Sequence, residues 1–200
     1  MALDTYAGLK AEIALFLART DLTSEIDTFI DLFEAWASRN LRVRQMEVEA
    51  TATAAEYIPL PDDYVELRDI QVQSTPRRQL QYVTPEYADF VTADGGVGDP
   101  SYYTLVGNQL RLVPAPSSAD DVRISYWRRI PALSVSNTTN WLLTDWPDAY
   151  LWGSVLQARA YLPDEQRAAF VEQSWRAVMA EVQRAGKHSN VGGSLTIRSV

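Results

Sequence analysis

Residues 102–113 read YYTLVGNQLRLV, in which two five-residue segments flank Gly107 and Asn108. Both segments are rich in the apolar and aromatic residues typical of short strands. Gly and Asn can both adopt a positive φ, so together they can close a two-residue turn between antiparallel strands. The stretch therefore predicts a β-hairpin in the middle of the chain.

Further strand candidates lie on both sides of this hairpin. They are short, tend to alternate in hydrophobicity, and are separated by Pro, Gly, Asp and Ser. With the two hairpin strands they are EVEATATAAEYIPLP (47–61), VELRDIQVQ (65–73), RRQLQYV (77–83), PSYYTLV (100–106), QLRLVPAP (109–116) and DVRISYWRRI (121–130). This series predicts an antiparallel sheet.

A short helix and a Gly-rich loop interrupt the predicted sheet. The helix is expected over TPEYADFVTA (84–93), and the loop is DGGVGDP (94–100). A phosphate-binding loop would continue into Gly-Lys-Ser or Gly-Lys-Thr, and a dinucleotide-binding loop would be followed by a helix. Because a strand follows here, we interpret the loop as a turn.

Apolar residues before the sheet recur at helical spacing and predict two amphipathic helices. On the first helix they are Leu3, Tyr6, Ile13, Phe16 and Leu17, and on the second Ile26, Phe29, Ile30, Phe33, Trp36, Ala37 and Leu41. Ser24 followed by Asp27 resembles a capping box at the start of the second helix. The connection is short, so we expect an antiparallel pair.

Helical spacing returns after Trp141. Thr144 or Asp145 is expected to cap a helix that has Pro147 in its first turn. Pro163 is expected to end this helix, and the last helix to end near Gly186.

These elements predict an α+β protein in which the N- and C-terminal helices pack together. We expect a four-helix bundle from the N- and C-terminal helices, residues 1–46 and 141–187. An antiparallel β region, residues 47–140, is inserted between them. An extended C-terminal arm, residues 188–200, follows the bundle.

Candidate catalytic and metal-binding residues are scarce. The chain has no cysteine, and its one histidine, His188, lies in the polar segment GKHSNVGG far from any acidic cluster. The acid pairs Asp62–Asp63 and Asp120–Asp121 lie in turn sequences beside Pro and Ser, which favours solvated turns over acid–base catalysis. We therefore predict no catalytic, metal-binding or cofactor-binding residues, and no cofactor.

Charge and hydropathy exclude two further classes of protein. No segment approaches the roughly 18 apolar residues of a membrane span, and the N-terminus lacks the features of a signal peptide. We therefore expect no membrane partner and synthesis in the cytoplasm. The formal net charge of −8 and the isoelectric point near 4.7 argue against adhesive binding of nucleic acid.

The stretch NWLLTDWPDAYLW (140–152) contains three of the six tryptophans. Three interpretations remain open for Trp141, Trp146 and Trp152. They can pack within the helical bundle, they can meet another subunit, because Trp is enriched in interface cores, or they can line a closed pocket for a small ligand.

Three segments carry a resemblance to a known family: YIPLPDDYVELRDIQV (57–72), DPSYYTLVGNQLRLVPAPSSADDVRISYWRRIPALS (99–134) and TNWLLTDWPDAYLWGSVLQARAYL (139–162). They resemble the head-to-tail adaptor (connector) proteins of tailed bacteriophages, particularly those with short tails. None of the three is a catalytic signature. The resemblance rests on the residues of these segments and on the spacing between them, over about residues 55 to 162.

The resemblance implies a structural, non-enzymatic virion protein at the head-to-tail junction, present in the host cytoplasm during assembly. It implies a homo-oligomeric ring, expected to be a dodecamer, between the portal protein and the tail nozzle or hub protein. Double-stranded DNA would pass through the ring during ejection without specific binding. No active residues are implied.

The C-terminal arm is expected to bind the portal. Gly192 and Gly193 provide a hinge, and the alternating residues Leu195, Ile197 and Val200 suit an added strand or pockets on a partner. Folding of this strand onto the protein's own sheet is the alternative.

A carboxylate-dependent phage glycan hydrolase is the alternative function. Such an enzyme would bring two acidic residues together in one cleft, about 5–10 Å apart, with the pKa of one of them raised.

Overall fold

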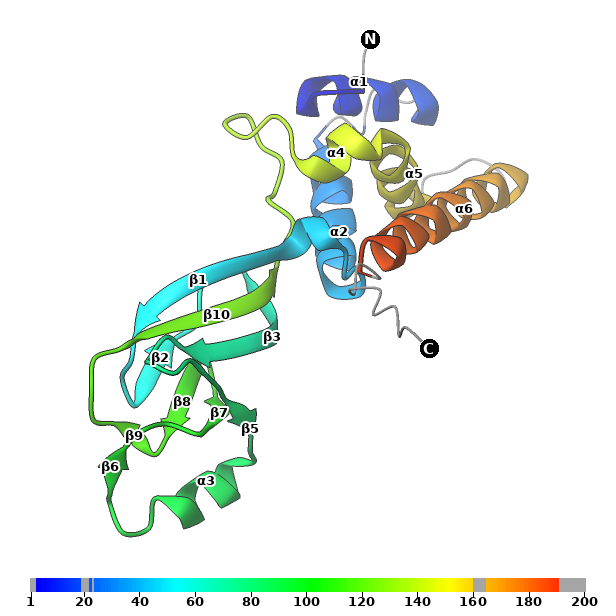
Figure 1. The fold of residues 1–200 in the computed structure, drawn as a ribbon. Coiled ribbons are helices and arrows are strands. Elements are labelled where there is room, and N and C mark those ends of the chain that lie inside the picture. The colour runs from blue at the N-terminus through cyan, green and yellow to red at the C-terminus, as the bar shows by residue number, and fades with distance from the viewer. Residues whose placement is uncertain (1–2, 19–21, 23, 160–164, 191–200) are drawn as a thin grey trace, which may run out of the picture. The chain divides into compact units, whose positions relative to one another are not determined.

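The computed structural model describes residues 3–18, 22, 24–159 and 165–190. Contacts divide the chain into two compact units (Figure 1). The helical unit contains Met1–Met46 and Arg129–Val200, and the β unit contains Glu47–Arg128. Residues 129–140, which follow the last strand, therefore group with the helices.

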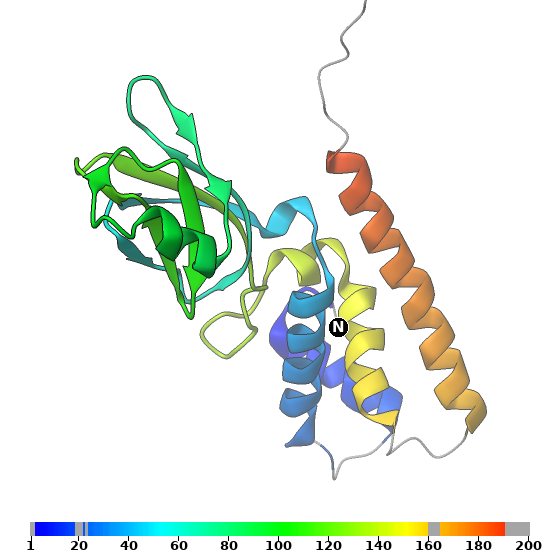
Figure 2. The same cartoon turned by 90° about the horizontal axis from the view of Figure 1, so that it is seen from below.

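The helical unit contains α1 (Tyr6–Leu17), α2 (Glu25–Asn40), the 3-10 turn η1 (Arg44–Met46), α4 (Trp141–Asp145), α5 (Pro147–Gln157) and α6 (Glu165–Asn190). Helix α5 packs against both α2 and α6 (Figure 2). The core between these helices includes the fully buried side chains of Ile30, Phe33 and Tyr150. Residue 153 must be glycine, because a Cβ atom there would lie 2.2 Å from a ring carbon of Phe33.

Local sequence explains where these helices begin and end. Thr5 caps α1 by accepting a hydrogen bond from the Gly8 amide, and Ala18 ends the helix in the left-handed conformation. Ser24 does not cap α2, since its hydroxyl donates to Glu25 instead. The predicted capping box is therefore wrong, and Asp27 accepts from Tyr6.

The β unit contains three sheets and one helix, α3 (Pro85–Val91). The first sheet has the order β1 (Glu47–Thr53), β10 (Asp121–Arg128), β3 (Tyr64–Val72) and β4 (Arg78–Gln79). The second has the order β2 (Tyr57–Pro59), β8 (Gln109–Val113), β7 (Tyr102–Val106) and β5 (Gln81–Tyr82). The third pairs β6 (Val97–Gly98) with β9 (Ala115–Pro116). Apolar side chains from both four-stranded sheets form one core, which includes Ile58, Ile70, Leu110 and Ile124.

The predicted hairpin is confirmed. Strands β7 and β8 pair in antiparallel fashion with Val106 opposite Gln109. Gly107 takes a φ of +60°, whereas Asn108 does not have a positive φ.

The prediction of a four-helix bundle with an inserted antiparallel β region is wrong in its architecture, although the protein is α+β. The described residues contain six α-helices, and one of them, α3, belongs to the β unit. Trp146, at φ −138° and ψ 63°, separates α4 from α5 before Pro147. Strand content is substantial, and β5–β7 and β6–β9 are parallel pairs. Alternation along one strand does not reveal the direction of its partner, so the sequence pattern could not predict these pairs.

Candidate functional site

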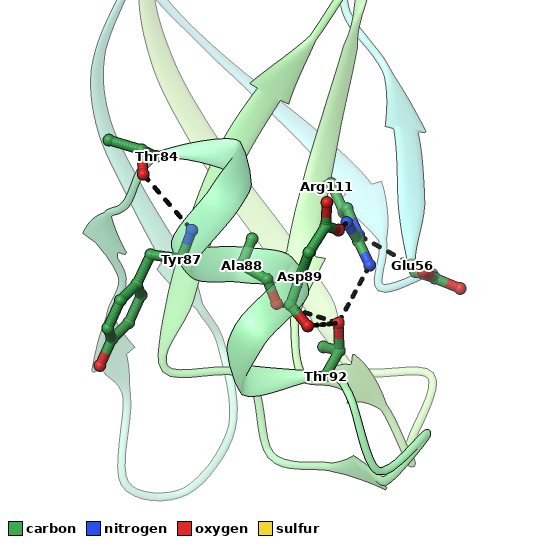
Figure 3. Close-up of polar contacts among 7 residues, drawn as sticks. All are labelled: Glu56, Thr84, Tyr87, Ala88, Asp89, Thr92 and Arg111. Carbon is green, nitrogen blue, oxygen red and sulfur yellow. Dashed lines mark hydrogen bonds and ion pairs between the residues drawn. The ribbon is translucent and has the colours of Figure 1, made fainter.

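Arg111 on β8 holds helix α3 against the second sheet of the β unit (Figure 3). Its guanidinium forms an ion pair with Asp89 at 2.5 Å, donates to the Thr92 hydroxyl at 3.2 Å, and forms an ion pair with Glu56 at 3.4 Å. The Arg111 side chain is only 14% exposed. The hydrogen bond to Asp89 raises the pKa of Arg111 above its usual range, with burial acting in the opposite direction.

The ends of α3 are fixed by side chains of the helix itself. Thr84 accepts a hydrogen bond from the Tyr87 amide at the N-terminus, and Pro85 occupies the first turn. At the C-terminus the Thr92 hydroxyl donates to the Ala88 carbonyl at 2.9 Å. Arg111 contacts both Asp89 and Thr92, so it fixes which face of α3 lies on the sheet.

A buried polar network lies within the helical unit. Glu34 on α2 is 5% exposed, and its Oε1 accepts hydrogen bonds from the Leu133 amide at 2.9 Å and the Tyr150 hydroxyl at 2.8 Å. Asn140 donates to the Tyr150 oxygen and to the Pro131 carbonyl. The network therefore attaches the segment 129–140 to α2 and α5.

Burial changes the acidity of two groups in this network. It raises the pKa of Glu34 to about 7, although the bonds from Leu133 and Tyr150 act in the opposite direction. Burial and the nearby Glu34 charge also raise the pKa of Tyr150. Glu34 occupies the apolar face of α2 beside Phe33 and Ala37, and an acidic residue at such a position is the signal that sequence reasoning missed.

Asn140 caps α4, since its Oδ1 accepts from the Leu143 amide at 2.9 Å. The prediction that Thr144 or Asp145 caps the helix that has Pro147 in its first turn, α5, is wrong, because the residue at the N-cap of α5 is Trp146. Helix α5 begins at Pro147 as expected, but no side-chain hydrogen bond caps it.

The three candidate interface tryptophans occupy two different places. Trp141 and Trp146 line one cavity of about 190 Å³ together with Val43 and with residues of η1 and α6, such as Val182. Trp152 lies elsewhere and makes edge-on ring contacts with Phe16 and Phe170. The structure therefore does not bring the three rings into one closed pocket.

The candidate arm residues, Gly192, Gly193, Leu195, Ile197 and Val200, lie outside the described residues. His188 belongs to the last turns of α6.

Asp62 and Asp63 occupy a turn, as predicted, whereas Asp120 follows the bend at Ser117 and Ser118, and Asp121 is the first residue of β10. Asp63 accepts a hydrogen bond from the Tyr126 hydroxyl at 2.9 Å, and Asp120 accepts from Ser118 at 2.6 Å. Asp62 is exposed in the turn before β3. Asp63 and Asp120 therefore each accept a hydrogen bond from a different hydroxyl group.

Negative charge is concentrated in the β unit. Residues 47–128 contain 13 acidic and 6 basic side chains, a formal charge of −7. The remainder of the chain contains 13 acidic and 12 basic side chains, a formal charge of −1 with histidine neutral.

Among the described residues, no helix is long and apolar enough to cross a membrane. The same part of the chain contains no group of three or more His, Cys, Asp and Glu that could hold a metal ion.

The family model described as SU10 adaptor protein matches residues 4–198, a range that includes both units. A search of curated proteins finds no match.

Proposed function

The chain belongs to the SU10 adaptor protein family, and from this we propose that it binds beneath the portal of a filled bacteriophage head and presents a platform to the tail. The resemblance to phage head-to-tail adaptors is thereby confirmed. The observation that carries the proposal is the family match over almost the whole chain, residues 4–198. The role is structural, and the site of action is the head-to-tail junction of the virion.

We propose that the protein acts as a closed homo-oligomeric ring, a dodecamer when the portal is present. Neighbouring subunits would contact each other through different faces, which closes a ring by rotation. Trp141, Trp146 and Trp152 are the proposed subunit contacts. Trp141 and Trp152 are each partly exposed, which leaves ring surface for a neighbour.

The C-terminal arm is the proposed portal contact. Gly192 and Gly193 allow the chain to turn, and Leu195, Ile197 and Val200 provide apolar anchors. A strand that adds to a partner gains main-chain hydrogen bonds along its length. Each copy in a ring repeats the contact, which raises the overall affinity.

The charge distribution supports passage of DNA through the ring. Like charges repel, so the β unit, with a formal charge of −7, disfavours contact with the phosphate backbone. Duplex DNA would then move past the protein without adhering.

No observation favours the glycan hydrolase. Glu34 has a raised pKa, but its carboxyl group is buried and bonded to Leu133 and Tyr150. The cavity beside Trp141 has no carboxylate in its lining, and neither has a second cavity beside Tyr102. A structural role is therefore the function we propose.

Native mass spectrometry of the purified protein, alone and with the assembled portal of the same phage, tests the proposal. We expect a complex in which a dodecamer of this protein is bound to the portal. The free protein can remain monomeric, because an interface that forms only on docking prevents premature assembly. A protein that stays unbound and monomeric in the presence of the assembled portal would contradict the proposal.

A further inference from the structure

Helix α3 carries its aromatic side chains on the side that faces solvent. Its buried residue is Ala88, while Phe90 is 78% exposed and Tyr87 is 47% exposed. Residues three apart share one side of a helix, so Tyr87 and Phe90 project together, and their ring centroids lie 6.4 Å apart. An amphipathic helix normally places such residues against the core.

A third ring extends this surface onto the neighbouring strand. Tyr102 on β7 meets Tyr87 edge-on, with centroids 6.0 Å apart. We call Tyr87, Phe90 and Tyr102 the α3 surface. Tyr102 also lines a hollow of about 390 Å³ with Arg78, Gln81 and other polar residues. Aromatic side chains beside a hollow are typical of the central contacts of protein interfaces.

The α3 surface is held in a fixed orientation before any partner arrives. Arg111 binds Asp89 and Thr92 on the opposite side of the helix (Figure 3). In that view Tyr87 points away from Arg111. Exposure of the rings is therefore a consequence of specific polar contacts. A preorganised surface loses less conformational entropy on binding.

The chain segment that carries α3 is acidic, and the cations beside it come from neighbouring strands. Residues 84–99 contain four acidic side chains and no Lys or Arg. Arg111 pairs with Asp89, and Arg78 pairs with Asp99. The remaining two, Glu86 and Asp94, form no ion pair within the described part of the chain.

We infer that the α3 surface binds a tail protein through a patch that combines apolar side chains with Lys or Arg. Aromatic rings accept apolar groups and attract cations through their faces. Glu86 and Asp94 complement the positive charge, which steers association and excludes wrong partners. The same carboxylates disfavour DNA and anionic membranes. This inference rests on the proposed adaptor function and adds the chemistry of the tail contact.

The test compares Phe90→Ser with Val135→Ser in binding to each purified tail protein of the same phage. Val135 is the matched control, because it is an exposed apolar residue of the helical unit, at 90% exposure. Phe90→Ser is expected to weaken binding of one tail protein about 30-fold or more, as for a central aromatic contact. Val135→Ser is expected to bind like the unchanged protein. Thermal unfolding of each variant verifies that it is folded.

A charge variant tests the stated chemistry of the partner. Glu86→Lys is expected to weaken the same tail contact and to reduce its dependence on salt, whereas Asp62→Lys, in an exposed turn of the same unit, leaves it unchanged. Binding of both variants to portal-bearing heads is expected to remain normal.

Three results would overturn the inference. Phe90→Ser could bind every tail protein as tightly as the unchanged protein. It could instead weaken association between copies of this chain, which would assign the α3 surface to a second copy. Glu86→Lys could strengthen the tail contact. If the unchanged protein binds neither heads nor any tail protein, the adaptor function itself fails, and that result is distinct from the other three.

Discussion

Glu34 is an acidic side chain that the fold keeps in a nearly dry environment. Its neighbours supply two hydrogen-bond donors but no cation, and Asp31 adds a further negative charge. Burial therefore favours the neutral form of the carboxyl group. The folded protein holds a proton on Glu34 at a pH where the unfolded chain has released it.

This difference predicts that stability falls as pH rises. The pKa of Glu34 is about 7 in the folded protein, against an ordinary value of 4.5. The contribution of the neutral group is fully present below pH 4.5 and is lost as pH rises towards 7. Glu34→Gln keeps an oxygen acceptor and removes the charge. We expect it to raise the free energy of unfolding at pH 8 by at most about 3 kcal/mol relative to the unchanged protein.

Chemical denaturation at pH 5 and pH 8 measures this effect. The advantage of Glu34→Gln should shrink at pH 5, and Asp62→Asn serves as the exposed control with no such change. An equal effect of Glu34→Gln at both pH values would contradict a titrating Glu34.

The paired aspartates make a second prediction at the level of single residues. Replacing Asp62 and Asp63 by Asn, or Asp120 and Asp121 by Asn, should leave infectivity of the virion within a modest factor. Asp120 makes a local contact with Ser118, and Asp63 accepts one hydrogen bond from Tyr126, which the amide oxygen of Asn can also accept. Plaque counts on complemented phage measure the result. Loss of infectivity from normally assembled particles would instead support an enzymatic role.

Local sequence patterns predicted the secondary-structure elements whose limits are marked by residues within or next to the element. The hairpin at Gly107 and helix α3 were predicted closely, because a turn residue and a Thr-Pro start mark their limits. The parallel pairing of β5 with β7 depends on contacts between separate segments, which alternation does not encode. The contact between Arg111 and Asp89 likewise joins residues 22 positions apart in sequence.

A further prediction concerns the C-terminal arm. Deleting residues 189–200 should leave the melting temperature nearly unchanged, because the core of the helical unit already includes Val171 and Val182 of α6. The truncated protein should fail to bind portal-bearing heads, since the proposed strand pairing and apolar contacts with the portal would be lost in every copy. Head binding is measured by co-sedimentation, and DNA-filled heads should leak.

Substitutions in an arm of full length show whether head binding depends on the side chains of the arm or only on its length. Leu195→Ser with Ile197→Ser should weaken head binding, whereas Thr196→Ser should not. Tight binding of the truncated protein to heads would contradict the proposed arm, and so would its complete unfolding.

For the whole molecule, the unequal charge of the two units predicts weak interaction with DNA. The unchanged protein should not retard duplex DNA in a gel at about 50 mM salt, because the β unit repels phosphate. A variant with Asp62→Lys, Glu86→Lys and Asp94→Lys reduces the charge of the β unit from −7 to −1 and should retard DNA more than the unchanged protein. Retardation by the unchanged protein would argue against an inert channel.

The two covalent links between the units also determine where a mechanical load is carried. One link, between Met46 and Glu47, follows shortly after the end of α2. The other, between Arg128 and Arg129, leads directly to the hydrogen bonds of Ile130 with Ser38 and of Leu133 with Glu34, and both acceptors belong to α2. Tension applied to the β unit would therefore be delivered mainly to one helix, and α2 would act as the mechanical anchor between the two units.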